Sequence, residues 1–175
     1  MDDDDDFESY RDFPLFRKLG DGEIAGFVAA CEAIELPAGQ TFIRQGEEGK
    51  RIFFVTAGEM EVFYVDDEGD EHELALLTAP AVVGEMEFLT RETRTASVRA
   101  RTPVVALTLG FDRLFEQLQA GDPATVRVFF HITQVLARRL EAMDRKFAEL
   151  NQQAPGARFD EMRAFQQKLM TEWTV

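Results

Sequence analysis

The feature that most constrains the fold is a series of short β-prone runs between residues 41 and 108. These runs are rich in Phe, Ile, Val and Thr, and glycine-containing turns separate them at residues 46–49, 57–59 and 66–70. Strands at a spacing of about 10 residues are typical of a β-sandwich or barrel. No helical segment of crossover length lies between them, which argues against a parallel α/β fold. The sequence therefore predicts a mainly β, antiparallel domain.

Alternation of side chains is clearest just before the turn at residues 66–70. Met60, Val62 and Tyr64 alternate with the residues between them, as expected for a strand whose two faces differ. The turn itself is rich in Asp and contains Gly, a composition typical of a hairpin tip. We predict that it joins this strand to a second strand at residues 72–77.

Helical patterns flank the β region. Residues 13–35 are predicted to be helical in two pieces, with a break at residues 21–23 and Asp21 as the N-cap of the second piece. The segments predicted to be helical after the β region are residues 111–118, residues 123–150 and a final short amphipathic helix at residues 158–173.

The composition fits one globular domain with an acidic surface. The chain has 175 residues, 45% of them hydrophobic, which is enough to bury a sizeable core. The formal net charge is −14, and the aspartates at residues 2–6 repel one another, so residues 1–12 are expected to be a disordered tail. The remaining acidic charge argues against contact with nucleic acid or an anionic membrane.

The ends and the apolar runs predict no membrane segment. No apolar run approaches the ~18 residues of a transmembrane helix. The first residues, Met followed by five Asp, have the character of neither a signal peptide nor a transit peptide. The expected location is the cytoplasm.

Residue types that usually carry catalysis or metal binding are few and scattered. Cys31 is the only cysteine; it lies in an apolar stretch and is interpreted as a buried small hydrophobe. His72 and His131 lie in different predicted elements with no cysteine beside them. Ser9 and Ser97 lack the context of a nucleophile elbow. We expect neither an enzyme nor a metal site.

One motif between residues 83 and 98 has the chemistry of an anion cradle. A Gly84-Glu85 turn is followed by a short apolar segment, which is the only interruption of the β pattern. Nine residues after Glu85 comes Arg94, set among small residues. A small-residue turn exposes main-chain N–H groups, and an arginine supplies a fixed positive fork. Glu85 adds an acceptor for hydroxyl groups. A ligand with a phosphate and ribose hydroxyls needs this combination.

At these residues the chain resembles the cyclic-nucleotide-binding domain family, whose phosphate-binding cassette has the same pattern. The resemblance extends over about residues 13–150 and includes glycines at 39, 46 and 58. It implies an eight-strand jelly roll flanked by N-terminal helices and a long C-terminal helix. The expected domains are a tail at residues 1–12, the cyclic-nucleotide-binding-like domain at 13–150 and a short helical extension at 151–175.

The resemblance also implies a role for each cassette residue toward cAMP or cGMP. Glu85 is expected to accept from the ribose 2′-hydroxyl, and Arg94 to pair with a phosphate oxygen. Main-chain N–H groups near Met86, Glu87 and Thr95 complete the shell, and Gly84 permits close approach. The predicted ligand-binding residues are Gly84, Glu85, Met86, Glu87, Arg94, Thr95, Ala96 and Ser97. The alternative is that Glu85 and Arg94 form a salt bridge that caps the turn.

Three positions depart from the family pattern. Glu87 stands where the family usually has a small residue, and a second carboxylate repels a phosphodiester unless it turns away or pairs with a cation such as Arg91. Pro80 precedes the cassette and lacks a main-chain donor. The turn near Met143 and Asp144 replaces hydroxyl residues that read adenine in the activator protein of the family. Thr95 fits either purine.

The function that the resemblance implies is a stand-alone regulatory module. It would bind cAMP or cGMP without a cofactor and signal to an unknown protein effector through its C-terminal helix. The alternative is a nucleotide-independent scaffold or partner-binding protein that keeps the roll. Transcriptional members carry a helix-turn-helix after the long helix, but about 25 residues follow Leu150 here, so DNA binding is not expected.

The long predicted helix carries an apolar stripe at heptad spacing. Its members are Phe129, Thr133, Leu136, Leu140, Met143, Phe147 and Leu150. In a parallel dimer, Arg139 would lie opposite Asp144 of the second copy. The stripe predicts a homodimer along this helix; the alternative is that it packs onto the chain's own β-roll.

Overall fold

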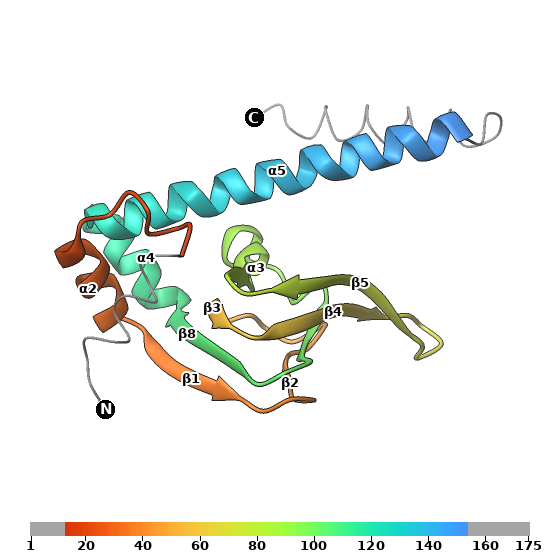
Figure 1. Ribbon diagram of the computed structural model, residues 1–175, viewed down its shortest axis with the longest axis horizontal. Coiled ribbons are helices and arrows are strands. Elements are labelled where there is room, and N and C mark those ends of the chain that lie inside the picture. Colours follow the sequence, from red (N-terminus) through yellow and green to blue (C-terminus); the bar gives the residue numbers. More distant parts are fainter. Residues whose placement is uncertain (1–12, 154–175) are drawn as a thin grey trace. The chain divides into compact units, whose positions relative to one another are not determined.

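The computed structural model describes residues 13–153. They belong to two compact units, one ending at Ile132 and the other beginning at Thr133, and one helix runs through this boundary. The helices are α2 (Asp21–Ala29), α3 (Glu85–Thr90), α4 (Phe111–Gln119) and α5 (Pro123–Gln153) (Figure 1). The strands are β1 (Glu32–Leu36), β2 (Thr41–Ile43), β3 (Arg51–Ala57), β4 (Glu59–Val65), β5 (Glu71–Thr78), β6 (Ala81–Val83), β7 (Ser97–Ala100) and β8 (Val104–Gly110).

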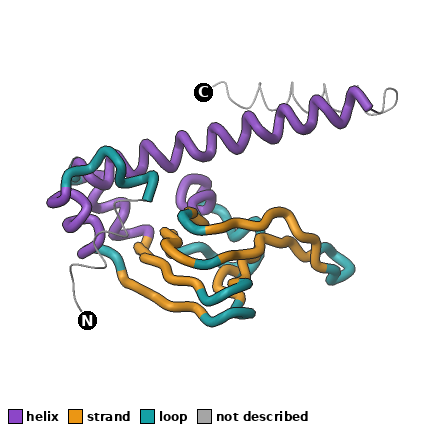
Figure 2. Tube along the Cα trace, viewed as in Figure 1, coloured by secondary structure: helices purple, strands orange, loops and turns teal. Residues whose placement is uncertain are grey.

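The eight strands of the described chain form two antiparallel sheets of four (Figure 2). The strand order is β1-β8-β3-β6 in the first sheet and β2-β7-β4-β5 in the second. In the first sheet the longest pairing joins β3 to β8, from Arg51 opposite Gly110 to Ala57 opposite Val105. The predicted mainly β roll with flanking helices is therefore confirmed.

Both sheets contribute side chains to one apolar core. Buried members of this core are Leu36, Ile43, Phe53, Val55, Met60, Val83, Val98, Ala100, Val104 and Ala106. Burial of apolar surface is the main favourable contribution to folding, at about 25 cal/mol per Å². The core fixes the ends of β6 and β7, and the short helix α3 and its following loop span the interval between those two strands.

The N-terminal region differs from its predicted structure. Helix α2 ends at Ala29, and residues 32–36 form β1, whereas the sequence predicted helix as far as residue 35. The reason is tertiary: β1 pairs with β8 from Glu32 opposite Thr108 to Leu36 opposite Val104. The N-cap of α2 is Gly20 rather than Asp21, and the Glu23 carboxylate accepts from the Gly20 N–H at 2.8 Å.

The predicted hairpin between β4 and β5 is confirmed. Asp66 organises its tip, because its carboxylate accepts from the N–H groups of Glu68 and Asp70 and pairs with His72 at 2.5 Å. These contacts, led by the His72 hydrogen bond, lower the pKa of Asp66. The His72 ring also stacks on Tyr64.

Cys31 follows α2 and is partly buried. Its Sγ lies 3.3 Å from the Phe27 carbonyl oxygen, to which the thiol donates. Burial raises the pKa of this thiol to about 12, so it stays protonated at neutral pH. The interpretation of Cys31 as a small hydrophobe agrees with this environment.

Helix α5 begins within the first unit and packs there through one face. The ring of Phe129 lies 6.3 Å from that of Phe88 on α3, and the Arg127 guanidinium donates to the Lys18 carbonyl and to Glu23. Phe129 belongs to the predicted dimer stripe, so this position also serves intrachain packing. The large apolar residues exposed on α5 include Val126, Phe130 and Leu140.

Several predictions fall outside the described residues. They are the tail at residues 1–12, the helix at residues 158–173 and the side chains of Met143, Phe147 and Leu150. Among the described helices, none is both long enough and apolar enough to cross a membrane.

Candidate functional site

The site is built on the turn that leads from β6 into α3. Gly84 is the N-cap of α3 and has a φ of 81°, a left-handed conformation that favours glycine. A Cβ added at Gly84 would lie 2.6 Å from Nη1 of Arg94 and 3.1 Å from the Arg51 carbonyl oxygen. Gly84 is therefore required both by the backbone conformation and by the close approach of Arg94.

Arg94 occupies a buried slot beside this turn, with 6% of its surface exposed. Its Nη1 donates to the Gly84 carbonyl at 3.1 Å, and its Nη2 donates to the Arg51 carbonyl at 2.6 Å. The guanidinium also lies 5.7 Å from the centre of the Phe111 ring. These contacts orient the arginine fork before any ligand binds, which is what recognition of an oxyanion requires.

The anion that Arg94 holds in this structure is the carboxylate of Glu87. Nη1 of Arg94 lies 2.5 Å from Oε2 of Glu87, and both side chains are 94% buried. The Thr95 N–H donates to the other carboxylate oxygen at 3.2 Å. One guanidinium and one main-chain N–H thus bind the two oxygens of a single carboxylate. A phosphate presents oxygens of the same kind, so Glu87 takes donors that a phosphate would need.

Glu87 was predicted either to face a phosphate, to turn away, or to pair with Arg91. It is instead paired with Arg94, the residue predicted to bind the phosphate. Glu87 lies two residues further along the chain than Glu85, which the alternative prediction had paired with Arg94. Glu85 itself is buried, with 4% of its surface exposed.

The other predicted ligand-binding residues differ in exposure. Ser97 is buried, and its hydroxyl accepts from the Gln45 N–H at 3.0 Å. Met86 is 45% exposed, Thr95 is exposed, and Ala96 is half-buried. The structure thus gathers Gly84, Glu87, Arg94 and Thr95 through direct contacts, and it assigns Ser97 to a bond with the β2–β3 loop.

Gly49 completes the slot, and the sequence identified it only as part of a turn. A Cβ at Gly49 would lie 2.9 Å from Cβ of Glu87 and 3.0 Å from Cζ of Arg94. The β2–β3 loop is held here by the bonds between Gly46 N–H and the Arg94 carbonyl and between Arg94 N–H and the Glu47 carbonyl. The second glycine of the turn at residues 46–49 was the available signal for this role.

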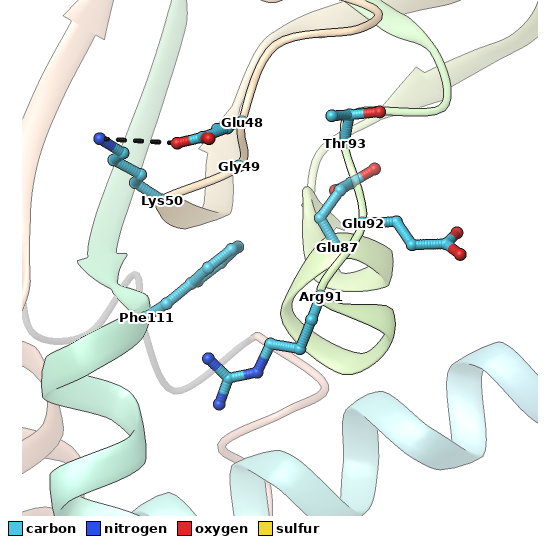
Figure 3. A pocket seen from close by; sticks show the side chains of 8 residues that line it. All are labelled: Glu48, Gly49, Lys50, Glu87, Arg91, Glu92, Thr93 and Phe111. Atoms are coloured by element: carbon cyan, nitrogen blue, oxygen red, sulfur yellow. Dashed lines mark ion pairs between the residues drawn. The ribbon is translucent and has the colours of Figure 1, made fainter.

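A cavity of about 370 Å³ opens beside Glu87. Three segments line it: the β2–β3 loop, α3 with the loop after it, and the first residue of α4. The lining residues are Glu48, Gly49, Lys50, Glu87, Arg91, Glu92, Thr93 and Phe111 (Figure 3). The Phe111 ring projects into the space between the β2–β3 loop and α3, with Lys50 on one side and Arg91 on the other. Glu87 therefore binds Arg94 and the Thr95 N–H and also lines this cavity.

Comparison with known proteins identifies the family. The sequence model of the family described as cyclic nucleotide-binding domain matches residues 33–121, which include α3, Arg94 and Gly49. The chain belongs to the cyclic nucleotide-binding domain family.

Proteins similar to this chain include a channel, a catabolite activator protein and a kinase regulatory subunit. A cyclic nucleotide-gated potassium channel of Mesorhizobium japonicum is 34% identical over 116 residues, which are 66% of this chain and 30% of the channel. The catabolite activator protein of Thermus thermophilus has a TM-score of 0.67 and 27% identity, covering 79% of this chain and 63% of that one. The chain spans less than two thirds of the length of either protein.

The third relative is the regulatory subunit of a cAMP-independent protein kinase A from Trypanosoma brucei. Its structure has a TM-score of 0.63 and 27% identity and covers 73% of this chain and 44% of that one. That structure is of a triple mutant bound to cAMP; the first two substitutions exchange a glutamate for alanine and a threonine for arginine.

Proposed function

We propose that this chain is a regulatory module that binds a cyclic nucleotide, cAMP or cGMP, with its phosphate on Arg94, and that Glu87 is an internal anion which the phosphate must displace. The single observation that carries the proposal is the carboxylate of Glu87 held by the Arg94 guanidinium and the Thr95 N–H. The donors are fixed in place and bind an oxyanion. The cyclic phosphate of a nucleotide is an oxyanion attached to a ribose. The carboxylate of the buried Glu85 is the proposed acceptor for a ribose hydroxyl.

Displacement of Glu87 is necessary because Arg94 is the one buried cation at the site among the described residues. A phosphate that joined Glu87 at Arg94 would bring two negative charges to one positive charge. Like charges at short range in a poorly solvated site cost several kcal/mol. A ligand therefore binds as the Glu87 carboxylate leaves, and the affinity is set by the competition between the two anions.

The trypanosomal kinase subunit supports this role for the glutamate. In the mutant with cAMP bound, an alanine replaces a glutamate, and an arginine replaces a threonine seven residues further along the chain. A spacing of seven also separates Glu87 from Arg94 here. From this equal spacing we infer that Glu87 and Arg94 stand at the two positions substituted in that mutant, which favours a site that binds phosphate only after the glutamate moves.

The route from the site to the rest of the molecule begins next to Glu87. Phe88 packs against Phe111 on α4 at 5.3 Å and against Phe129 on α5 at 6.3 Å between ring centres. A rearrangement of Glu87 therefore acts on the residue that connects α3 with both following helices. A ligand shifts such an equilibrium only by its unequal affinity for the two states. We propose that α5 carries the signal to an effector and to a second copy of the chain.

The test is a calorimetric titration of the wild type, Arg94→Ala and Arg101→Ala with cAMP and with cGMP. Arg101 is the matched control, because it is an exposed arginine that pairs with the exposed Glu73 at 3.8 Å. Wild type and Arg101→Ala should bind one of the two nucleotides with equal affinity. Arg94→Ala should bind it at least tenfold more weakly, since truncation of one partner of a buried charged contact costs about 2–5 kcal/mol.

The second candidate function is that of a nucleotide-independent scaffold. The same ion pair favours it, because Glu87 neutralises Arg94 and leaves the slot without net positive charge. On this reading neither nucleotide binds to the wild type at millimolar concentration, and Arg94→Ala only destabilises the fold. The titration above separates the two functions.

A further inference from the structure

We infer that Lys50 and Arg91 form a receiving site for the Glu87 carboxylate, which moves into the cavity beside it when a phosphate takes its place on Arg94. The inference rests on the proposed function and adds the mechanism by which the site admits an anion. It assigns Lys50 and Arg91 as positioning residues, which act on the ligand only through Glu87.

The cavity supplies the space for this movement. Its volume is about 370 Å³, and Glu87 is one of its lining residues, so the side chain needs no opening of the core to enter it. Packing around the Glu87 Cβ is tight, because a Cβ at Gly49, which also lines the cavity, would come within 2.9 Å of the Glu87 Cβ and within 3.0 Å of Arg94. The cavity is the space into which we infer that the carboxylate moves when it leaves Arg94.

The cations that line the cavity are held by weak contacts. The Lys50 ammonium lies 4.0 Å from Glu48, and both side chains are more than 80% exposed, so this pair contributes little. The Arg91 guanidinium lies 5.3 Å from the centre of the Phe115 ring. A cation near a ring face is attracted by the ring, and this contact does not use the N–H donors of the guanidinium as hydrogen bonds do.

The acids around the cavity are Glu48, Glu87 and Glu92. In Figure 3 the Glu92 carboxylate is turned away from the Phe111 ring, whereas Glu48 faces Lys50. A Glu87 carboxylate that enters the cavity thus approaches one other acid and two cations. Each anion then has its own cation: the phosphate has Arg94, and Glu87 has Lys50 and Arg91.

The backbone holds Arg91 close to Glu87 and determines which substitution can test it. It is the only residue other than glycine in the described chain with a positive φ, at 62°, and it is the C-cap of α3. Its N–H donates to the Glu87 carbonyl at 3.0 Å, which fixes it one helical turn from Glu87. Asparagine tolerates this conformation better than most residues, so Arg91→Asn removes the charge with little added strain.

The experiment is a double-mutant cycle on cyclic nucleotide affinity. Lys50→Ala and Arg91→Asn are each made in the wild type and in Glu87→Ala, and each protein is titrated with cAMP and cGMP by calorimetry. Arg113→Ala is the matched control, because Arg113 is an exposed cation on α4 that pairs with Glu116 and does not line the cavity. Lys50→Arg tests whether the charge alone suffices.

With Glu87 present, Lys50→Ala and Arg91→Asn should each weaken binding about two- to fivefold, the range for exposed ion pairs. In the Glu87→Ala background both should have no effect, and Lys50→Arg should retain the wild-type affinity. Equal losses in the two backgrounds would overturn the inference, because the cations would then act on the ligand directly or on the fold. If neither the wild type nor Glu87→Ala binds a cyclic nucleotide, the proposed function is wrong. The receiving site of Lys50 and Arg91 is then rejected as well.

Discussion

Replacement of Glu87 by glutamine changes one charge in the site and leaves its shape nearly intact. In the wild type the Glu87–Arg94 pair is 94% buried at 2.5 Å. Removal of one partner from a buried pair typically costs about 3–5 kcal/mol. The glutamine amide oxygen can still accept from Arg94 or Thr95, and Arg94 keeps its bonds to the Gly84 and Arg51 carbonyls. A hydrogen bond to a charged group contributes about 1.5–3 kcal/mol, so we expect Glu87→Gln to destabilise the free protein by about 1–3 kcal/mol.

The same substitution should strengthen ligand binding. In Glu87→Gln the buried Arg94 charge has no negative charge from residue 87 beside it. A phosphate supplies a negative charge there without displacing another anion. An affinity gain of about 1–3 kcal/mol corresponds to roughly 5- to 150-fold. Ligand that binds only the folded state raises its stability by mass action, so saturating nucleotide should bring Glu87→Gln back to or above the wild type.

Thermal unfolding with and without nucleotide measures both effects together. Glu87→Gln should melt about 2–4 °C lower than the wild type for each kcal/mol lost, and nucleotide should raise its melting temperature by more than that of the wild type. Ser9→Ala is the control for effects of mutation and purification that do not involve the site. Ser9 is far from the site in the sequence and is outside the described residues. A Glu87→Gln protein that melts and binds like the wild type would show that the Glu87–Arg94 pair does not control the site.

Four further predictions concern the arginine, assembly, DNA and the hairpin. Arg94→Lys should recover only part of the affinity lost in Arg94→Ala, because lysine cannot donate to Gly84, Arg51 and an anion from one planar fork; titration of both variants measures the difference. Leu140→Asp should convert a homodimer to monomers in sedimentation while the control Gln134→Asp stays dimeric, and a wild type that is monomeric at about 100 μM would reject the dimer. Duplex DNA should not bind at physiological salt, given the net charge of −14; a salt-dependent micromolar affinity in fluorescence anisotropy would contradict this. His72→Gln should return the pKa of Asp66 toward its ordinary value in an NMR titration. Because the pKa of Asp66 is lowered in the folded protein, its contacts stabilise the fold fully above the unfolded pKa. This stabilisation is lost as the pH falls through the folded pKa.

The sequence predicted those parts of the fold that depend on local pattern. Strand β4, the Asp-rich hairpin tip and the short helix α3 all appear where the pattern indicated them. The alternation predicted for β4 is broken by a β-bulge between Val62 and Phe63, so Phe63 is buried and Tyr64 is exposed. Strand β1 was missed, because residues 32–35 continue an apolar helical period and its partner β8 lies about seventy residues away in the chain. Pairing between distant segments overrides local periodicity, and no local pattern within residues 30–36 indicates pairing with β8.

The site divides in the same way. The proximity of Gly84 and Arg94 was predicted from the spacing of the motif. A turn followed by a helix of one or two turns brings the arginine back to the start of that helix. The partner of Glu87 did not follow, because it depends on how the loop after α3 closes over the helix. Gly49 was missed for a related reason: the β2–β3 loop reaches Arg94 only in three dimensions, through bonds at Gly46 and Glu47.

In the proposed mechanism, a cyclic phosphate and the Glu87 carboxylate exclude each other at Arg94. A crystal structure of the wild type with cAMP, or with cGMP if that is the nucleotide it binds, tests this most directly. We expect a phosphate oxygen within hydrogen-bond distance of the Arg94 guanidinium and of the Thr95 N–H, with the Glu87 carboxylate in the cavity that Lys50 and Arg91 line. A complex in which Glu87 remains on Arg94 while the nucleotide phosphate lies on other residues would contradict it.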